Sequence, residues 1–233
     1  MSIINAIMAQ AAGGFNSPTF VGANSNKAPN GAAVSVDLSG IDIQSGDLII
    51  GAHMAGVGAN KLSAMSLSST GYTEIASHYS AGGYDLCMEV YGKIADGTET
   101  AFATNTLSDT TTSVCCIAAV FRGMTQVVPV DSSTGLAASS TILNVDDVTW
   151  PSVTGIGLLV YFGATGHATG TKTYTTPTDL SGFITLGEND NVDVTGGFGY
   201  TENQYGSYTA NTWVMSGSNS LSSVAYTVFK LTK

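Results

Sequence analysis

The chain has little charge, and positive charge is the scarcer sign. Only 10% of its 233 residues are charged, whereas an average soluble domain has roughly 25%. Seven Lys and Arg residues stand against seventeen Asp and Glu residues, which gives a net charge of −10. Binding to nucleic acid and to anionic membrane surfaces both depend on clustered Lys and Arg. The composition therefore argues against both kinds of partner.

Long apolar runs and a regular set of cysteines are also missing. No stretch reaches the ~18 to 20 apolar residues that a spanning helix needs, so we expect no membrane insertion. The cysteines are Cys87, Cys115 and Cys116, an odd number with two adjacent members, which is a poor disulfide framework. We interpret them as small buried hydrophobic residues. A bridge from Cys87 to one of the other two across neighbouring strands is the minor alternative.

What the chain has in abundance is short β-prone runs separated by turn residues. Val, Ile, Thr, Tyr and Phe cluster in runs that Gly, Ser, Asn and Asp interrupt at intervals of roughly 8 to 12 residues, a pattern typical of sandwiches and barrels. Residues 33–38 alternate like a half-buried strand, and residues 48–52 form a continuous apolar run that suits a central strand. The other predicted strands are 84–94, 114–121, 157–162, 192–200, 212–215 and 224–231.

Four of these blocks occur twice at a nearly constant distance. The offset is 110 residues between Leu48 and Leu158 and 109 residues between Tyr91 and Tyr200. The blocks of the first half are 46–52, 69–75, 90–93 and 113–121, and their counterparts are 155–161, 180–186, 199–202 and 222–229. A shared offset of this kind indicates an internal repeat that organises the fold.

The repeat predicts an all-β, jelly-roll-like β-sandwich built from two repeated halves. Each half supplies four or five strands, and a small sheet with one apolar face needs a second sheet to cover it. We therefore predict one sandwich over residues 33–233, with halves at about 33–123 and 142–233 and a crossing linker from Arg122 to Pro151. Two separate small sandwiches are the alternative.

The N-terminal residues 1–32 are predicted to form a short helix followed by an extended connecting arm. The helix would run from Ser2 to about Ala12 and end at two glycines. Its apolar residues fall on one face: Ile3, Ile4, Ile7 and Met8. Two interpretations stay open, since this face either packs on its own domain or docks the protein to a neighbour in an assembly.

Several short motifs resemble a widespread kind of β-sandwich protein encoded in phage genomes. The matching motifs are Gly46-Asp47-Leu48-Ile49-Ile50, Gly71-Tyr72-Thr73, Tyr91-Gly92-Lys93-Ile94-Ala95, Gly97-Thr98-Glu99, Phe121-Arg122-Gly123, Thr175-Thr176-Pro177 and Ser222-Ser223-Val224-Ala225. The resemblance covers roughly residues 33–231, and it departs from the pattern in lacking a proline before Gly71. It implies a virion structural component, such as a head decoration protein, a tail or fibre part, or an adhesion module. No catalytic set accompanies the resemblance.

Candidate chemistry is sparse. His53, His78 and His167 lack the spacing of a metal pair. A glycosidase needs two carboxylates beside a cleft, and the chain offers Asp85, Glu89, Glu188 and Glu202. A buried Glu89 would have a raised pKa, but we expect its side chain to point outward between inward-facing neighbours. We therefore predict neither an enzyme nor a cofactor.

Two segments are weak candidates for binding. Oxygen-bearing side chains at Glu188, Asp190 and Asp193 suit Ca²⁺, although the run lacks the spacing of a calcium-binding hand. An aromatic segment carries Tyr200, Tyr205, Tyr208 and Trp213, with amide side chains between them. Ordinary strand packing is the first interpretation of this segment, a protein interface the second, and glycan binding the third.

The leading functional hypothesis is therefore a virion protein on the surface of a phage particle, a decoration or appendage subunit that assembles with other virion proteins. Its interface candidates are Ile3, Ile4, Ile7, Met8, Tyr205, Tyr208 and Trp213. A receptor-binding tail-fibre module that recognises a host glycan is the alternative, and a polysaccharide-degrading enzyme is a distant third. Self-association into a homo-oligomer is also expected, and the resemblance suggests a trimer.

Overall fold

The computed structural model describes residues 19–108, 112–124, 126–138, 142–145, 148–149, 157–167, 170, 172–177, 180–188, 193–202, 207–208, 211–215 and 221–232. The predicted helix and its residues Ile3, Ile4, Ile7 and Met8 lie outside this part of the chain. Within the described part, no helix is long and apolar enough to cross a membrane.

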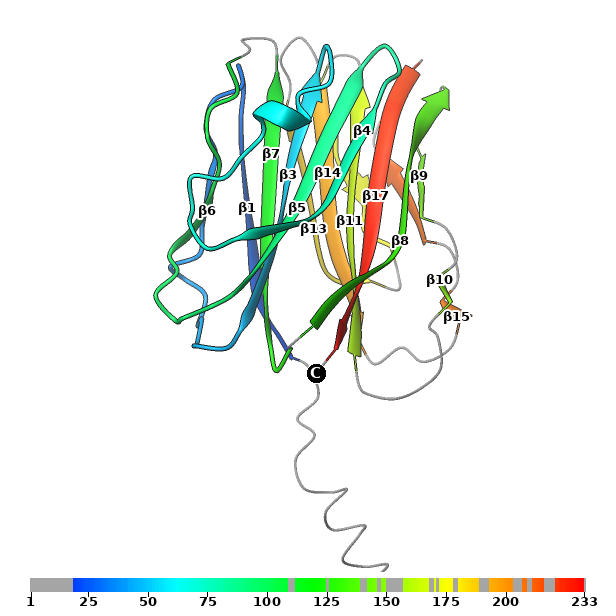
Figure 1. The fold of residues 1–233 in the computed structure, drawn as a ribbon. Helices are drawn as coiled ribbons and strands as arrows, with labels where there is room; N and C mark the ends of the chain where they lie inside the picture. The colour runs from blue at the N-terminus through cyan, green and yellow to red at the C-terminus, as the bar shows by residue number, and fades with distance from the viewer. Residues whose placement is uncertain are drawn as a thin grey trace, which may run out of the picture.

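Two five-stranded antiparallel sheets dominate the fold (Figure 1). The first sheet has the order β1-β7-β3-β5-β4, and the second has the order β13-β14-β11-β17-β8. Strands of the first sheet are β1 (Thr19–Ala28), β3 (Leu48–Val57), β4 (Thr73–Ser80), β5 (Asp85–Ile94) and β7 (Ser113–Arg122). Strands of the second are β8 (Gln126–Ala138), β11 (Gly157–His167), β13 (Ser181–Glu188), β14 (Asp193–Glu202) and β17 (Leu221–Thr232).

The two sheets pack face to face. Strand β1 contacts β13, β7 contacts β14, β3 contacts β11, β5 contacts β17 and β4 contacts β8. Apolar side chains from both sheets form one core between them, including Ile50, Met54, Phe121, Phe162 and Phe229. The predicted all-β sandwich is confirmed at this level.

Strand order is the same in both sheets when the second is read from β8. If the five strands of each sheet are numbered along the chain, their spatial order in both sheets is 1-5-2-4-3. The central strands β3 and β11 occupy the same place in their sheets. Strand β3 lies between β5 and β7, and β11 lies between β14 and β17, and these flanking strands contain the matching sequence blocks.

Smaller elements cover the outer face of each sheet. The first is covered by β2 (Ser35–Asp37), β6 (Ala101–Ala103) and the 3-10 helix η1 (Leu62–Ala64), and the second by β9 (Ile142–Val145), β12 (Tyr174–Thr175) and β16 (Asn211–Met215). Strand β10 (Val148–Thr149) pairs with β15 (Ser207–Tyr208). Because both faces of a central strand are covered, β3 is buried throughout rather than at alternate positions.

Close packing of the outer layers depends on glycines in the sheets. A Cβ atom on Gly51 would lie 2.8 Å from Cε2 of Phe102. In the second sheet, Cβ atoms on Gly163 and Gly197 would lie 2.8 and 2.6 Å from Cζ3 of Trp213. These distances are shorter than any normal contact, so the aromatic rings rest directly on glycine backbone.

Two predicted connections are strands of the sandwich. The predicted arm contains β1, which pairs along its whole length with β7, so the sandwich begins at Thr19 rather than at residue 33. Side-chain amides of Asn24 and Asn26 donate to backbone carbonyls of Asp37 and Ser35, both at 2.9 Å, and tie this edge to β2. The polar residues that suggested an arm therefore stabilise a sheet edge.

The predicted crossing linker contains β8, the edge strand of the second sheet, which pairs with β17. Its proline suggested a linker, but Pro129 lies beside a register shift where the strand is irregular. An edge strand tolerates a proline at such a position because the missing N–H is not needed by an inner neighbour.

Candidate functional site

Motif residues of the first half meet at one end of the first sheet, where they form two ion pairs. Arg122 donates from Nε to Oδ1 of Asp47 at 3.0 Å and from Nη2 to Oδ2 at 2.9 Å, a bidentate contact with a buried carboxylate. The same guanidinium donates to the backbone carbonyl of Asp42 at 2.6 Å, and Asp47 also accepts from the backbone N–H of Gln44. The Gly-Asp and Phe-Arg-Gly motifs thus fasten β3 to β7.

A second ion pair joins Lys93 to Glu99, with 2.7 Å between Nζ and Oε1. Burial opposes ionisation of Glu99, but hydrogen bonds from Lys93 and from the backbone N–H groups of Asp96 and Gly97 outweigh it and lower its pKa to about 2. The Lys93 ammonium also lies 5.8 Å from the ring centroid of Tyr72. These motif residues satisfy one another, so they stabilise the fold and leave no free catalytic group here.

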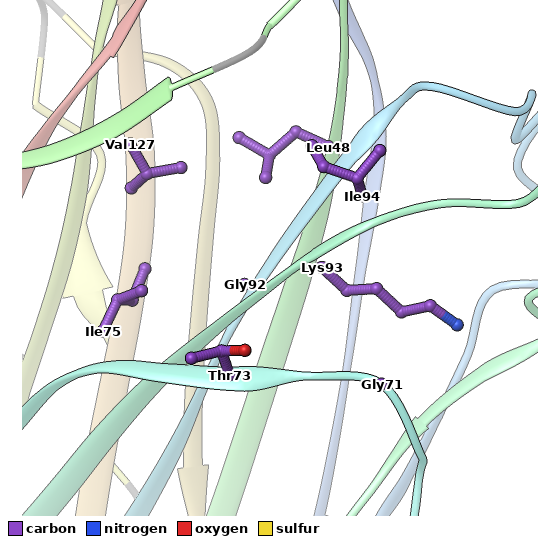
Figure 2. Close-up of a pocket in the computed structure, with 8 residues that line it drawn as sticks. All are labelled: Leu48, Gly71, Thr73, Ile75, Gly92, Lys93, Ile94 and Val127. Atoms are coloured by element: carbon purple, nitrogen blue, oxygen red, sulfur yellow. The ribbon is translucent and has the colours of Figure 1, made fainter.

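An apolar hollow of about 260 Å³ opens beside these motifs (Figure 2). Its lining comes from β3, β4, β5 and the start of β8, and Figure 2 shows Leu48, Ile75 and Val127 extending toward one another while the Lys93 side chain runs away from them. Ile94, one of three large hydrophobic residues that the structure shows as exposed, belongs to this lining and is 53% exposed. The hollow is therefore an apolar surface without a covering group among the described residues.

A polar hollow of about 330 Å³ lies on the other side of Lys93. Its hydroxyl groups bond the protein itself: Ser68 Oγ donates to the carbonyl of Thr104 and Ser69 Oγ to that of Ala101, each at 3.2 Å. Thr98 donates to the side chain of Asp96 at 2.5 Å. Tyr72 also lines this hollow, and its buried hydroxyl has no hydrogen-bond partner among the described residues. The hollow therefore combines internally bonded Ser and Thr hydroxyls with one unpartnered phenol group.

A row of polar residues is buried beneath the outer layer of the first sheet. His53 on β3 pairs in register with Glu89 on β5 and with Cys116 on β7. Neither ring nitrogen of His53 has a hydrogen-bond partner among the described residues, and burial lowers its pKa to about 3. Burial also raises the pKa of the Cys116 thiol, the opposite of what a nucleophile needs.

Glu89 does point away from its inward-facing neighbours Met88 and Val90, but the expectation that this outer face is exposed is wrong, because Glu89 is only 3% exposed. It faces the outer core, where Tyr91 donates a hydrogen bond to Oε2. Desolvation raises the pKa of Glu89 to about 7, with a smaller contribution from the charge of Glu74, while the Tyr91 hydrogen bond opposes the rise. The alternation argument failed because it assumed that the second face of β5 meets water.

The other two histidines lie apart from this row. His167 is buried on β11, where its Nε2 lies 2.9 Å from Oγ1 of Thr195. His78 on β4 contacts Thr227 on β17 between the sheets. Among the described residues, no group of three or more His, Cys, Asp or Glu side chains is arranged to hold a metal ion.

The predicted cation residues are only partly described. Asp193 begins β14 and is fully buried, in register with His167. Asp190 lies outside the described residues, and Glu188 ends β13 without a described side chain. Of the three carboxylates, only that of Asp193 is therefore described.

The aromatic segment divides between two cores. Trp213 is fully buried on β16 and makes an edge contact with Tyr174, with 5.6 Å between centroids. Tyr200 packs between the sheets, where its ring stacks on Phe20 at 4.6 Å. The prediction of Trp213 as an interface residue is therefore wrong for this fold, since no ligand reaches its ring. Tyr205 lies outside the described residues, and the side chain of Tyr208 is not described.

The cysteines are all free and buried, as interpreted from the sequence. Sequence reasoning missed the apolar hollow, although the apolar residue Val127 inside the predicted linker was a usable signal. Comparisons with protein-family models, with curated proteins and with solved structures found no match to the chain. The functional argument therefore rests on the surfaces and buried groups described above.

Proposed function

We propose that the protein is a structural component of a phage particle, a surface decoration or appendage subunit that assembles with other virion proteins. The observation that carries this proposal is the apolar hollow, whose lining includes the exposed side chain of Ile94. Exposed apolar surface that gathers in one place marks a site of protein association. The motif charges nearby are paired within the chain, so they serve the scaffold.

The finer description of the fold belongs to the same proposal. We infer that the jelly-roll-like sandwich arose from two repeated halves, each supplying one sheet and its outer cover. The shared strand order of the two sheets and the constant offset of the sequence blocks support this inference. A duplicated scaffold of this kind gives a durable particle component without requiring a catalytic centre.

The alternatives have less support. A glycan-binding module would use exposed aromatic rings, but Trp213 lies in a core. A glycosidase would need Glu89 beside a cleft, but Glu89 is sealed beneath an outer layer.

The proposal is tested on purified phage particles that carry this gene. Mass spectrometry of the particles and immunogold labelling with an antibody against the folded protein should find it at a regular position on their surface. Particles free of the protein, from a lysate in which it is abundant, would contradict the proposal.

A further inference from the structure

We propose that the apolar hollow is the docking site for the N-terminal segment of a neighbouring copy of this chain. The segment would place the apolar face that contains Ile3, Ile4, Ile7 and Met8 against Leu48, Ile75 and Val127. This inference rests on the proposed function, because it identifies the partner that such an assembly surface accepts.

The hollow lies between β4 and β8, the edge strands of the two sheets that face each other. These strands are joined near one end and separate at the other. Near one end, Ser80 Oγ on β4 donates to the backbone carbonyl of Gly135 on β8 at 2.6 Å. At the other end, the facing side chains are Ile75 and Val127, and they leave the hollow between them (Figure 2). An inserted apolar side chain would complete the core that the sheets leave open at this point.

The N-terminal segment leaves the fold from the same end of the sandwich but from the opposite edge. Phe20 on β1 pairs with Phe121, Phe121 with Leu48, and Leu48 with Ile94, which forms one row across four strands. Strands lie ~4.8 Å apart, so Phe20 and Ile94 are separated by roughly 14 Å and the β1 and β4 edges by roughly 19 Å. The start of β1, from which the N-terminal segment departs, and the hollow therefore lie at the same level on opposite edges of the first sheet.

This placement favours a neighbouring copy over the same chain. Residues 13–18 span at most ~20 Å when extended, about the width of the sheet, and the predicted helix of residues 2–12 adds about 16 Å. Within one chain, residues 13–18 would have to be almost fully extended across the end of the sheet to bring that helix to the hollow. In a copy placed beside the β1 edge, the hollow faces the departing segment directly. Repetition of this head-to-tail contact gives a ring where the rotation closes and a filament where it does not.

The first experiment measures the mass of the full-length protein by sedimentation equilibrium. We expect an oligomer for the unchanged protein and a mass near 23.8 kDa, that of one chain, for both Ile94→Asp and Ile7→Asp. Val214→Asp is the matched control, because Val214 is similarly exposed at 43% but lies on β16, away from the hollow. Circular dichroism checks that each variant is folded, and Ile94→Ser replaces Ile94→Asp if the charge prevents folding.

The second experiment distinguishes docking of the N-terminal segment within one chain from docking between two copies. An affinity-tagged Ile7→Cys protein is mixed with an untagged Ile94→Cys protein under mild oxidation, and we expect a mixed disulfide of the two chains. A chain that carries both cysteines and closes its own disulfide at every protein concentration, while the mixed pair fails, would overturn the inference. A monomeric unchanged protein would overturn it as well.

The docking inference and the proposed virion role can fail separately in these tests. If particles carry the protein but Ile94→Asp keeps its oligomeric mass, the docking inference fails and the structural role stands. If the mixed disulfide forms but particles lack the protein, the docking inference stands and the virion role fails.

Discussion

Replacement of Glu89 by Gln should remove a large pH dependence from the stability of the protein. The carboxyl group has a pKa of about 7 in the fold, against an ordinary value of 4.5, because burial disfavours its charged form. The folded state therefore holds the proton more tightly than the unfolded state. The stabilisation that this gives is complete below pH 4.5 and is lost as the pH rises from 4.5 to about 7. At ~1.4 kcal/mol per pH unit, the loss is about 3 kcal/mol.

His53 changes stability in the opposite direction over part of this range. Its pKa falls from 6.5 to about 3, so the unfolded state binds the proton more tightly, and stability rises as the pH rises from 3 to 6.5. The two effects oppose each other between pH 4.5 and 6.5. In this range the stability of the unmodified protein reports only their sum. The informative quantity is the difference in unfolding free energy between the unmodified protein and Glu89→Gln at each pH.

The measurement is urea denaturation from pH 4.5 to 8, followed by Trp fluorescence at constant ionic strength and one protein concentration. We expect the unmodified protein to lose about 3 kcal/mol relative to Glu89→Gln across this range. Asp96→Asn is the control, because Asp96 is exposed and the amide keeps an oxygen for the hydrogen bonds from Thr98. A difference that stays constant within about 0.5 kcal/mol, as for an ordinary surface change, would refute the burial of the Glu89 carboxyl.

Two further predictions concern the packing and the ion pairs. Arg122→Met should lower the unfolding free energy, because it leaves the buried Asp47 carboxylate without its bidentate partner. Adding Asp47→Asn should recover part of the loss in the same denaturation assay, and no recovery would contradict the charge explanation. Gly163→Ala should cost about 1 to 3 kcal/mol by overpacking, because its Cβ would lie 2.4 Å from Cδ2 of Leu143. Gly135→Ala, where the added atom meets nothing within 4 Å, is the matched control, and equal melting temperatures for the two variants would exclude a tight outer layer.

The central strands were predictable because burial on both faces produces a sequence signal of its own. The continuous apolar run that starts at Leu48 needs no alternation, and it indicated a central strand correctly. The edge strands were not predictable in the same way. Strand β1 has the composition of a loop because Asn24 and Asn26 use their amides to fasten a neighbouring element. Strand β8 tolerates Pro129 because it has only one neighbour in its sheet.

The candidate site was harder to predict than the fold. Burial of Glu89 depends on an outer layer whose residues are distant in sequence, so local alternation could not reveal it. The apolar hollow has the same origin, since Leu48, Ile75 and Val127 meet only through the packing of two sheets. Trp213 illustrates the converse case, because an aromatic residue suited to a surface contact is buried against glycines of the second five-stranded sheet.

Gly163 and Gly197 also determine whether the outer layer of one sheet could replace the outer layer of the other. Five residues after Leu158, the neighbouring strands carry Gly163 opposite Gly197, but five residues after Leu48 they carry His53 opposite Glu89. One sheet offers a bare groove that accepts an indole, whereas the other offers two polar side chains in the corresponding place. A hybrid chain in which the segment around Trp213 replaced the first cover would clash with His53 and Glu89. Each cover is therefore specific to its own sheet, and recombination between the two halves would be expected to yield chains that do not fold.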